Sequence, residues 1–466
     1  MGISSLGVGS GILTQDVLDQ LRAADEAQRV RPITLNLANE NDKKDSLAVI
    51  DASMTNFRDA INELKTATVF DGRKSTITGS SIELTASANS DLQDFTLNVT
   101  TLASKQLEQS GAFTASTDLV ASGMVGTGTM TLNVGSGTPV NISYDGTTTL
   151  ADLKKLINDN AGDQVDATIV QISATESRLF INAVGEGASN DISITDQAVG
   201  GGLDTKLTTG MDVLNLGGGV TSAGKDAAFT FNGQAITRSS NQVDDLITGY
   251  KLKLVETGSS TASVTQDRGA IETKIDSFVS KYNSIITELG KQTLSSTDSA
   301  TRGIFSSDSS IKNMNRSIKT MIGAATAGGA SMEDYGFSVD RDGKMTIDKT
   351  LLNTQLDANP TNVESFFTGG SFTKADSSVV TLTGAFSGFY DIVNGYTKTT
   401  GGLKLVKDDI ALNITSLEDR KTSATERLDA KYAILKKQYA AYNSLINKFN
   451  SASSIFTQLA NNQTNG

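Results

Sequence analysis

The sequence contains no cysteine, no histidine and no tryptophan, and each absence removes a class of chemistry. Without cysteine there are no disulfides, no thiolate nucleophile and no cysteine-bound zinc or iron–sulfur site. Without histidine the chain lacks the commonest general base and metal ligand, and every Ser-His-Asp arrangement is excluded. Aromatic residues make up only 6% of the chain, too few to favour a stacking platform for sugars or bases. We therefore expect no enzymatic activity, no cofactor and no metal site.

Basic residues are also outnumbered, with 40 Lys and Arg against 52 Asp and Glu and a net charge of -12. A nucleic-acid binder needs a clustered basic face, so this balance argues against one. The apolar runs fall short of the roughly 18–20 residues that cross a bilayer, and we expect no membrane insertion. The first residues lack a basic stretch followed by an apolar block, so we expect no cleaved signal peptide.

What the sequence does contain is helical spacing of apolar residues near both ends. Steps of three and four residues are typical of a helix that buries one face in a bundle or coiled coil. We predict that these residues form the partner-binding or coiled-coil seam of the protein. The N-terminal set is Leu47, Ile50, Met54, Phe57, Ile61 and Leu64. The C-terminal set is Leu428, Tyr432, Leu435, Tyr439, Tyr442, Ile446, Phe449 and Phe456.

Between about residues 75 and 266 the pattern changes to an alternation of apolar and polar residues, which is typical of strands. Asn232-Gly233 separates two such segments and predicts a type I′ hairpin turn, because both central residues of that turn need positive φ. Thr149 is placed to cap a helix that interrupts the strands. Farther along, Asp342-Gly343 predicts a second hairpin.

The order helix, strands, helix predicts an elongated α+β protein of several domains. In it, N- and C-terminal helices form a coiled-coil or bundle rod, and a mainly antiparallel β insertion makes one or two domains. The expected domains are terminal leg helices that are mobile in the monomer, a helical rod with a small hairpin, a β domain and a second β-rich domain. Their ranges are, in that order, 1–42 with 430–466, 43–74 with 268–429, 75–110 with 216–267, and 111–215.

Three motifs resemble a phosphate-binding loop, a calcium loop and a catalytic pair of carboxylates, but their spacing does not fit these sites. Residues 7–11 (GVGSG) resemble a phosphate-binding loop, but a dinucleotide fingerprint needs glycine where Ile12 stands. Residues 340–343 (DRDG) place glycine fourth, whereas a calcium loop has it sixth, so a hairpin turn is the better interpretation. The paired carboxylates at 244–245 and 408–409 are adjacent in sequence and do not face each other on a strand or a helix.

Several segments, in the right order along nearly the whole chain, resemble the flagellar filament cap protein family, also called flagellar hook-associated protein 2. The resemblance is weakest between about residues 112 and 216. The matching segments are 3–11 (ISSLGVGSG), 97–106 (LNVTTLASKQ), 231–241 (FNGQAITRSSN), 246–250 (LITGY), 276–283 (DSFVSKYN), 335–343 (YGFSVDRDG), 356–367 (LDANPTNVESFF) and 427–432 (RLDAKY).

The resemblance implies a secreted, non-enzymatic assembly protein at the distal tip of the bacterial flagellum. It implies export by the flagellar type III system and a closed ring of about four to six copies, often a pentamer in the family, under which flagellin folds and inserts. The implied partners are further copies of the chain, flagellin, the hook–filament junction protein and an export chaperone at the C-terminus.

Two other readings of the sequence stay open. A hook–filament junction protein or a flagellin-like axial subunit would be incorporated along the axis instead of staying at the tip. A surface adhesin could use the β insertion for cell adhesion, but the low aromatic content argues against it. The sequence does not determine the ring size or which flagellin is preferred.

Overall fold

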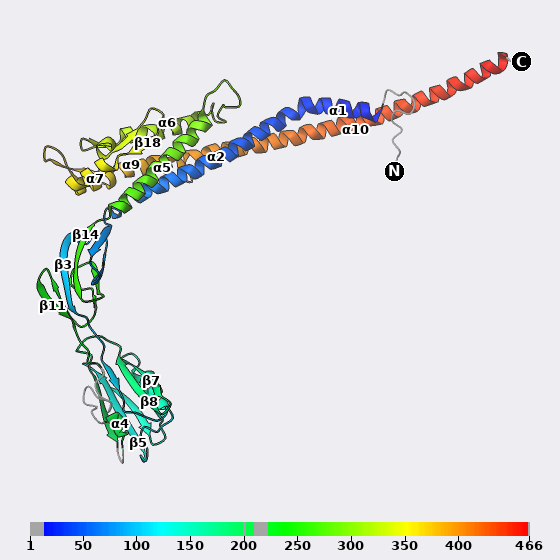
Figure 1. Ribbon diagram of the computed structural model, residues 1–466. Coiled ribbons are helices and arrows are strands. Elements are labelled where there is room, and N and C mark those ends of the chain that lie inside the picture. Colours follow the sequence, from blue (N-terminus) through cyan, green and yellow to red (C-terminus); the bar gives the residue numbers. More distant parts are fainter. Residues whose placement is uncertain (1–13, 199–201, 209–221, 465–466) are drawn as a thin grey trace. The chain divides into compact units, whose positions relative to one another are not determined.

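The computed structural model describes residues 14–198, 202–208 and 222–464 of the chain (Figure 1). These residues divide into two compact units. One unit combines Met1–Val69 with Gly269–Gly466, and we call it the helical unit. The other, Phe70–Arg268, is continuous in sequence, and we call it the β unit. The prediction of a chain that leaves a helical part, builds antiparallel sheets and then returns matches this order of elements.

The helical unit is built from long helices that lie side by side. In Figure 1, α1 and α2 run alongside α10, and α2 also packs on α9. The helices of this unit are α1 (Gln15–Arg29), α2 (Arg31–Leu64), α5 (Arg268–Thr293), α6 (Ser309–Ala324), α7 (Lys349–Ala358), α8 (Pro360–Thr368), α9 (Ala385–Thr397) and α10 (Gly402–Thr464). Two short 3-10 helices, Ala67–Val69 and Met332–Tyr335, complete it.

The helical segment near the N-terminus is divided at Val30. Val30 is the C-cap of α1 and the N-cap of α2, and Pro32 lies in the first turn of α2. Proline has no N–H to donate to the preceding turn, so it is accepted at a helix start and interrupts a helix elsewhere. Thr14 caps α1 by accepting a hydrogen bond from the Val17 amide at 3.3 Å.

Three two-stranded ladders also belong to the helical unit as far as it is described, where the sequence analysis expected a single small hairpin. The expected one joins β17 to β18 through Asp342-Gly343, and Gly343 has φ 87°. The other two turns contain Gly328-Gly329 and Ser377, all at positive φ. The pairs are β15 (Thr326–Ala327) with β16 (Ala330–Ser331), β17 (Phe337–Val339) with β18 (Met345–Ile347), and β19 (Gly370–Thr373) with β20 (Val379–Leu382).

The β unit has two separate hydrophobic cores. The first lies within a five-stranded antiparallel sheet of order β1-β14-β3-β10-β11 and a three-stranded sheet β12-β13-β2. Phe95, Leu97 and Phe229 are buried there, as their alternation predicts. The strands are β1 (Arg73–Thr78), β2 (Ile82–Ala86), β3 (Gln93–Thr101), β10 (Ala227–Phe231), β11 (Gln234–Arg238), β12 (Gln242–Val243), β13 (Tyr250–Leu254) and β14 (Gly258–Gln266).

The predicted hairpin at Asn232-Gly233 is confirmed. β10 and β11 pair with Phe231 opposite Gln234, so the loop between the strands consists of Asn232 and Gly233 alone. Asn232 has φ 47° and Gly233 has φ 84°, the two positive values that a type I′ turn requires.

The second core contains two three-stranded sheets, β4-β8-β7 and β6-β5-β9, and the helix α3. Thr149 caps α3 as predicted and forms a full capping box with Asp152. The elements are β4 (Leu107–Gln109), β5 (Thr127–Val134), β6 (Val140–Asp145), α3 (Leu150–Ala161), β7 (Val165–Ser173), β8 (Glu176–Ala183), β9 (Ile192–Ala198) and α4 (Thr205–Thr208).

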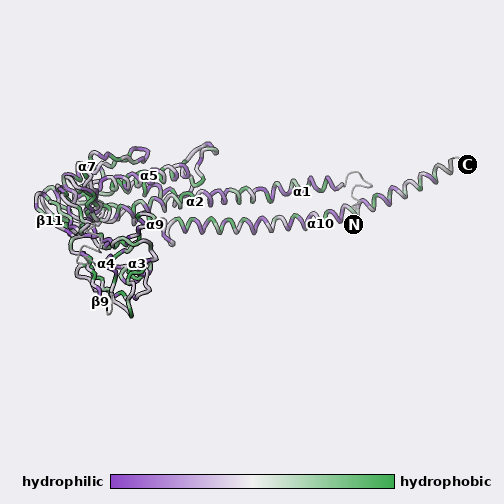
Figure 2. Tube along the Cα trace, turned by 60° about the horizontal axis from the view of Figure 1, so that its bottom comes forward, coloured by the Kyte–Doolittle hydropathy of each residue, from purple (hydrophilic) through white to green (hydrophobic). Residues whose placement is uncertain are grey.

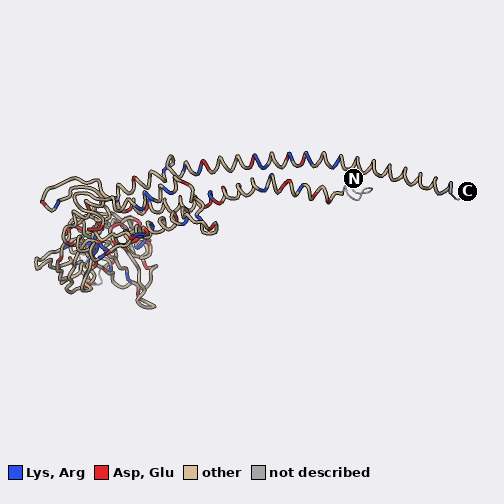
Figure 3. The backbone as a smooth tube through the Cα atoms, turned by 90° about the horizontal axis from the view of Figure 1, so that it is seen from above, with Lys and Arg blue, Asp and Glu red and all other residues tan. Residues whose placement is uncertain are grey.

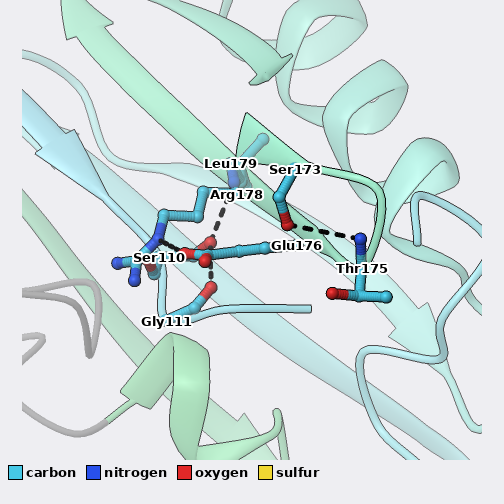
Figure 4. A network of polar contacts seen from close by, with 7 residues as sticks. All are labelled: Ser110, Gly111, Ser173, Thr175, Glu176, Arg178 and Leu179. Atoms are coloured by element: carbon cyan, nitrogen blue, oxygen red, sulfur yellow. Dashed lines mark hydrogen bonds and ion pairs between the residues drawn. The ribbon is translucent and has the colours of Figure 1, made fainter. Parts of the chain in front are cut away.

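Side chains also hold β8 to the segment after β4, as Figure 4 shows. The Leu179 amide donates to Ser110 Oγ at 2.8 Å, and this hydroxyl donates to the Gly111 carbonyl at 2.8 Å. Arg178 Nε donates to Glu176 Oε1 at 2.7 Å on the same strand. These polar groups satisfy one another within the β unit.

Candidate functional site

The N-terminal half of the predicted seam lies in the core of the helical unit. Each of its six side chains is at most 3% exposed, so none is available to another protein while the unit is folded. Burial on this scale contributes about 1.5–3 kcal/mol for each large apolar side chain. The residues are Leu47, Ile50, Met54, Phe57, Ile61 and Leu64, all on α2.

Aromatic rings connect α2 to α5 inside this core. The Phe57 ring lies 5.5 Å from that of Phe278 and 5.8 Å from that of Tyr282, measured between centroids. Tyr282 is fully buried, and among the described residues its hydroxyl has no hydrogen-bond partner. Burial raises the pKa of this hydroxyl to about 12, and the charge of Asp340 acts in the same direction. The interaction is therefore one of packing, without acid–base chemistry.

The C-terminal half of the predicted seam begins where α10 packs against α1. Leu428 and Tyr432 of α10 are buried together with Leu18 of α1 and with Val30, the residue between α1 and α2. Leu435 and Tyr439 are half-buried against this cluster. α10 thus supplies the second layer that the scattered apolar residues of α1 lack.

Polar contacts flank the apolar cluster of α1 and α10. Asp25 accepts a hydrogen bond from Tyr432 Oη at 2.9 Å and pairs with Lys431, while Arg22 pairs with Asp429. The hydrogen bond from Lys431, followed by that from Tyr432, lowers the pKa of Asp25. Burial, together with Asp25, raises the pKa of Tyr432.

Farther along α10 the predicted seam is exposed. Tyr442 is 59% exposed, Phe449 68% and Phe456 72%, while Ile446 is half-buried. We call these four residues the C-terminal stripe. α10 extends past the start of α1, and apolar positions continue along this end (Figure 2). Its neighbours Leu445, Ile455 and Leu459 are also more than half exposed.

Charge is scarce where the C-terminal stripe lies. No Asp, Glu, Lys or Arg follows Lys448, and Figure 3 shows acidic and basic residues along α10 giving way to uncharged ones toward its end. A helix that is exposed, apolar on one side and nearly uncharged is typical of a surface that another helix or protein covers.

The structure therefore separates residues that share one spacing in the sequence. It brings the α2 residues into a core, pairs Leu428 and Tyr432 with α1, and leaves the C-terminal stripe exposed. Val30, Arg22 and Asp25, at the contact of α1 with α10, are functional residues that the sequence pattern did not predict. No local signal points to Arg22 and Asp25, because their partners are more than 400 residues away.

The motifs tested for chemistry have structural roles where they are described. Asp340 Oδ1 accepts hydrogen bonds from the backbone amides of Asp342 and Lys344, which fixes the predicted turn. Asp245 pairs with Arg238 at 3.0 Å and Asp408 pairs with Lys404 at 2.6 Å. The GVGSG segment at residues 7–11 lies outside the described residues.

Neither a metal cluster nor a membrane-spanning helix is found in the described part of the chain. Within residues 14–198, 202–208 and 222–464, no three acidic side chains are grouped so that they could hold a metal ion. No helix in these ranges is both long and apolar enough to cross a bilayer.

The sequence of the chain matches the models of one protein family and proteins of that family. The family model for the N-terminus of flagellar hook-associated protein 2 matches residues 10–106, and the model for its C-terminus matches residues 224–451. The flagellar hook-associated protein 2 of Campylobacter jejuni is 28% identical over 88% of this chain and 71% of that protein. The Escherichia coli protein of the same name is 26% identical over 99% of both chains.

A solved structure shares the fold. The crystal structure of the D1-D2-D3 domains of the flagellar cap protein FliD from Escherichia coli aligns with a TM-score of 0.59 and 22% identity. The alignment covers 78% of this chain and 99% of that one. The predicted α+β fold, with terminal helices and an antiparallel β insertion, is thereby confirmed.

These matches first define a class, the structural proteins of the bacterial flagellum. Within that class, the two family models together cover more than half of the sequence. The chain belongs to the flagellar hook-associated protein 2 family, which the sequence analysis identified from its segments.

Proposed function

We propose that this protein caps the distal end of the flagellar filament and acts there as an assembly subunit without enzymatic activity. A ring of about four to six copies forms the cap, and exported flagellin folds and inserts beneath it. The single observation that carries this proposal from the chain's own structure is the C-terminal stripe. A cap must hold a tip whose subunits change, and an exposed apolar helix offers a contact surface for that purpose.

The proposal assigns a task to each part of the chain. The legs, residues 1–42 and 430–466, contact flagellin, and the rod, residues 43–74 and 268–429, supports them. The two β domains, 75–110 with 216–267 and 111–215, form the plate of the ring. Before assembly, the part of α10 that carries the C-terminal stripe is mobile, and an export chaperone covers it. The protein leaves the cell through the flagellar type III system and contacts the hook–filament junction protein before the filament grows.

The predicted partner-binding role belongs, in this proposal, to the exposed end of the seam. Tyr442, Phe449 and Phe456 are large apolar side chains that lose water contact when a partner covers them, at about 25 cal/mol per Å² of apolar surface. The α2 residues support the contact indirectly, because they hold the rod together. The half-buried Tyr439 lies at the boundary between these two roles.

The test replaces Tyr442, Phe449 and Phe456 with Ser in the full-length chain. Because all three side chains are exposed, we expect the thermal unfolding of both units to stay as in the wild type. We expect cells that carry the variant to release unpolymerised flagellin into the medium and to lose swimming motility. Immunogold electron microscopy should show wild-type protein at filament tips.

A matched control changes exposed apolar residues elsewhere on the same helix. Leu405 and Leu412 are 62% and 69% exposed near the start of α10. Their replacement by Ser removes a similar kind of surface and should leave filaments and motility unchanged. Full motility of the triple variant contradicts the proposed role of the stripe. Labelling along the whole filament instead of at its tip would favour an axial subunit.

A further inference from the structure

The chain passes twice between the two cores of the β unit. The outgoing segment contains Ser104 and Leu107, and the returning segment contains Ser222 and Lys225. The two segments pair as a ribbon, in which the Ser104 amide donates to the Lys225 carbonyl at 2.8 Å and the Leu107 amide donates to the Ser222 carbonyl at 3.0 Å. An isolated two-stranded ribbon is only marginally stable. By itself, this ribbon would let the two cores move relative to each other.

A loop of the second core lies against this ribbon. It follows β8 and consists of residues 185–190, and we call it the junction loop. The Gly187 amide donates to the Ser104 carbonyl at 3.1 Å. The Ala188 amide donates to Asp226 Oδ1 at 2.8 Å. The junction loop therefore contacts both segments of the ribbon.

The side chain of Glu186, in the junction loop, binds the segment before β12 with both carboxylate oxygens. Oε2 accepts hydrogen bonds from the Asn241 amide at 2.8 Å and from the Ser240 hydroxyl at 3.2 Å. Oε1 accepts one from the Asn241 side-chain amide at 3.1 Å. Val243 of β12, two residues farther on, is buried in the first core. Glu186 thus joins the second core to the first through hydrogen bonds to a carboxylate, which are stronger than those between neutral groups.

Asn241 is itself fixed to the first core and to the ribbon. Its side-chain oxygen accepts a hydrogen bond from the Ala103 amide at 2.9 Å, and its side-chain nitrogen donates to the Ala103 carbonyl at 2.9 Å. Its backbone carbonyl accepts a hydrogen bond from the amide of Leu254, a buried residue of the first core, at 2.8 Å. Asn241 therefore offers Glu186 two donors whose positions are already set.

Gly187 allows the junction loop to come this close to the first core. Its φ is 97°, and a Cβ added there would lie 2.6 Å from the Ser239 carbonyl oxygen and 2.8 Å from Asp226 Oδ1. Glycine adopts such a φ readily, and here it also avoids the two contacts that a side chain would make. The backbone of the loop is therefore packed directly against residues on both sides of the junction.

We propose that Glu186 is the positioning residue that fixes the two cores of the β unit as one rigid body. Relative motion is the default for domains that share a small, polar interface. Here the ribbon holds the two cores along one line, and Glu186 adds an attachment at a second place, on the segment before β12. Two separate attachments resist the bending and twisting that the ribbon alone would allow. This rigidity is a property of the single chain and is independent of capping.

The test measures the distance between the two cores in the full-length chain, which has no cysteine of its own. Cysteines in place of the exposed Thr76 on β1 and Thr168 on β7 carry spin labels, one on each core. We expect double electron–electron resonance to give a narrow distance distribution for the labelled wild type and one about twofold broader for E186A. E186Q should broaden it less, because its amide replaces one of the two accepting oxygens.

The matched control is E176A. Glu176 is half-buried like Glu186, but its carboxylate accepts a hydrogen bond from Arg178 Nε at 2.7 Å within the second core. E176A should leave the distance distribution unchanged. G187A is a second variant of the junction loop, and its added Cβ should displace the loop and broaden the distribution as E186A does. Circular dichroism spectra show whether each variant is folded.

The outcomes are distinct. A broad distribution in the wild type, or one in E186A as narrow as in the wild type, contradicts the role of Glu186. Equal broadening by E176A contradicts it as well, because the effect would then not come from the junction. If E186A does not fold, hydrogen exchange of residues 238–243 in E186Q decides. Faster exchange there than in E176A supports the role of Glu186, and equal exchange contradicts it.

Discussion

The Asp25 carboxylate accepts a hydrogen bond at 2.9 Å from the Tyr432 hydroxyl, across 407 residues of sequence. Lys431 pairs with the same carboxylate, and the apolar cluster of Leu18, Val30 and Leu428 lies beside it. This contact joins α1, the first described helix of the chain, to α10, the last. It also gives the contact of α1 with α10 a dependence on pH.

We expect acid to weaken the contact of α1 with α10. Because the pKa of Asp25 is lowered in the folded protein from its ordinary value of 3.8, the unfolded state binds a proton more readily. The stabilising contribution is thus complete above about pH 4 and is lost as the pH falls through the lower, folded pKa. The D25N variant should lose this acid dependence, since it has no carboxylate to protonate.

The chain has no native cysteine, so a pair of spin labels can report this contact directly. Ala23 and Ala433 are exposed on α1 and α10, and cysteines in their place carry the labels. Double electron–electron resonance should give a distance distribution that broadens in acid for the labelled wild type and stays unchanged for D25N. An equal change in both proteins would assign the acid response to other groups.

Removal of the Tyr282 hydroxyl should not destabilise the helical unit. The group is buried and has no hydrogen-bond partner in the part of the chain that the structure describes, so it brings a desolvation cost and no compensating bond. We expect Y282F to keep the free energy of unfolding within about 1 kcal/mol of the wild type or to raise it. F278A, at the centre of the same aromatic cluster, should lower it by about 3–5 kcal/mol. Urea titration followed by circular dichroism compares them, and a large loss in Y282F would reveal a missing partner.

The turn at Asn232-Gly233 gives a prediction about backbone strain. Gly233 has φ 84°, and a Cβ added there would meet nothing within 4 Å. A substitution is therefore costly through its backbone conformation alone. We expect G233V to destabilise the β unit by about 1–2 kcal/mol, because a β-branched residue strongly disfavours positive φ. G233N is the control and should cost less, since asparagine tolerates this region. Equal thermal midpoints for the two variants would argue against the strain.

Hydrogen exchange should differ along the single helix α10. Around Leu428 the helix is covered by α1, whereas around Phe449 its apolar side chains are exposed. An isolated helix is marginal in water and is held mainly by packing of its apolar face. In a dilute monomer we expect amides near Leu428 to be protected and those from about Leu445 onward to exchange fast. Assembly should protect the second group, and uniform protection in the monomer would contradict this view.

Much of the local structure could be predicted because its causes are local. Apolar residues spaced by three and four, such as Leu47 and Ile50, show which face of a helix is apolar. This spacing identified the apolar face of α2 and that of α10. Asn232-Gly233 and the Thr149 cap act through the few residues around them, and both were predicted correctly. The family could be identified as well, because its matching segments are spread along the chain.

Which apolar face is covered, and by what, depends on residues far away in sequence. Tyr432 and Tyr442 follow the same spacing on one helix, yet Tyr432 is buried under α1 and Tyr442 is 59% exposed. A repeat of three and four residues specifies the direction of a side chain but not the element opposite it. Which element lies opposite is decided by the tertiary packing of α10 against α1 and by pairs such as Asp25 with Tyr432. Burial is a property of the folded chain as a whole, so the exposed C-terminal stripe became visible only in three dimensions.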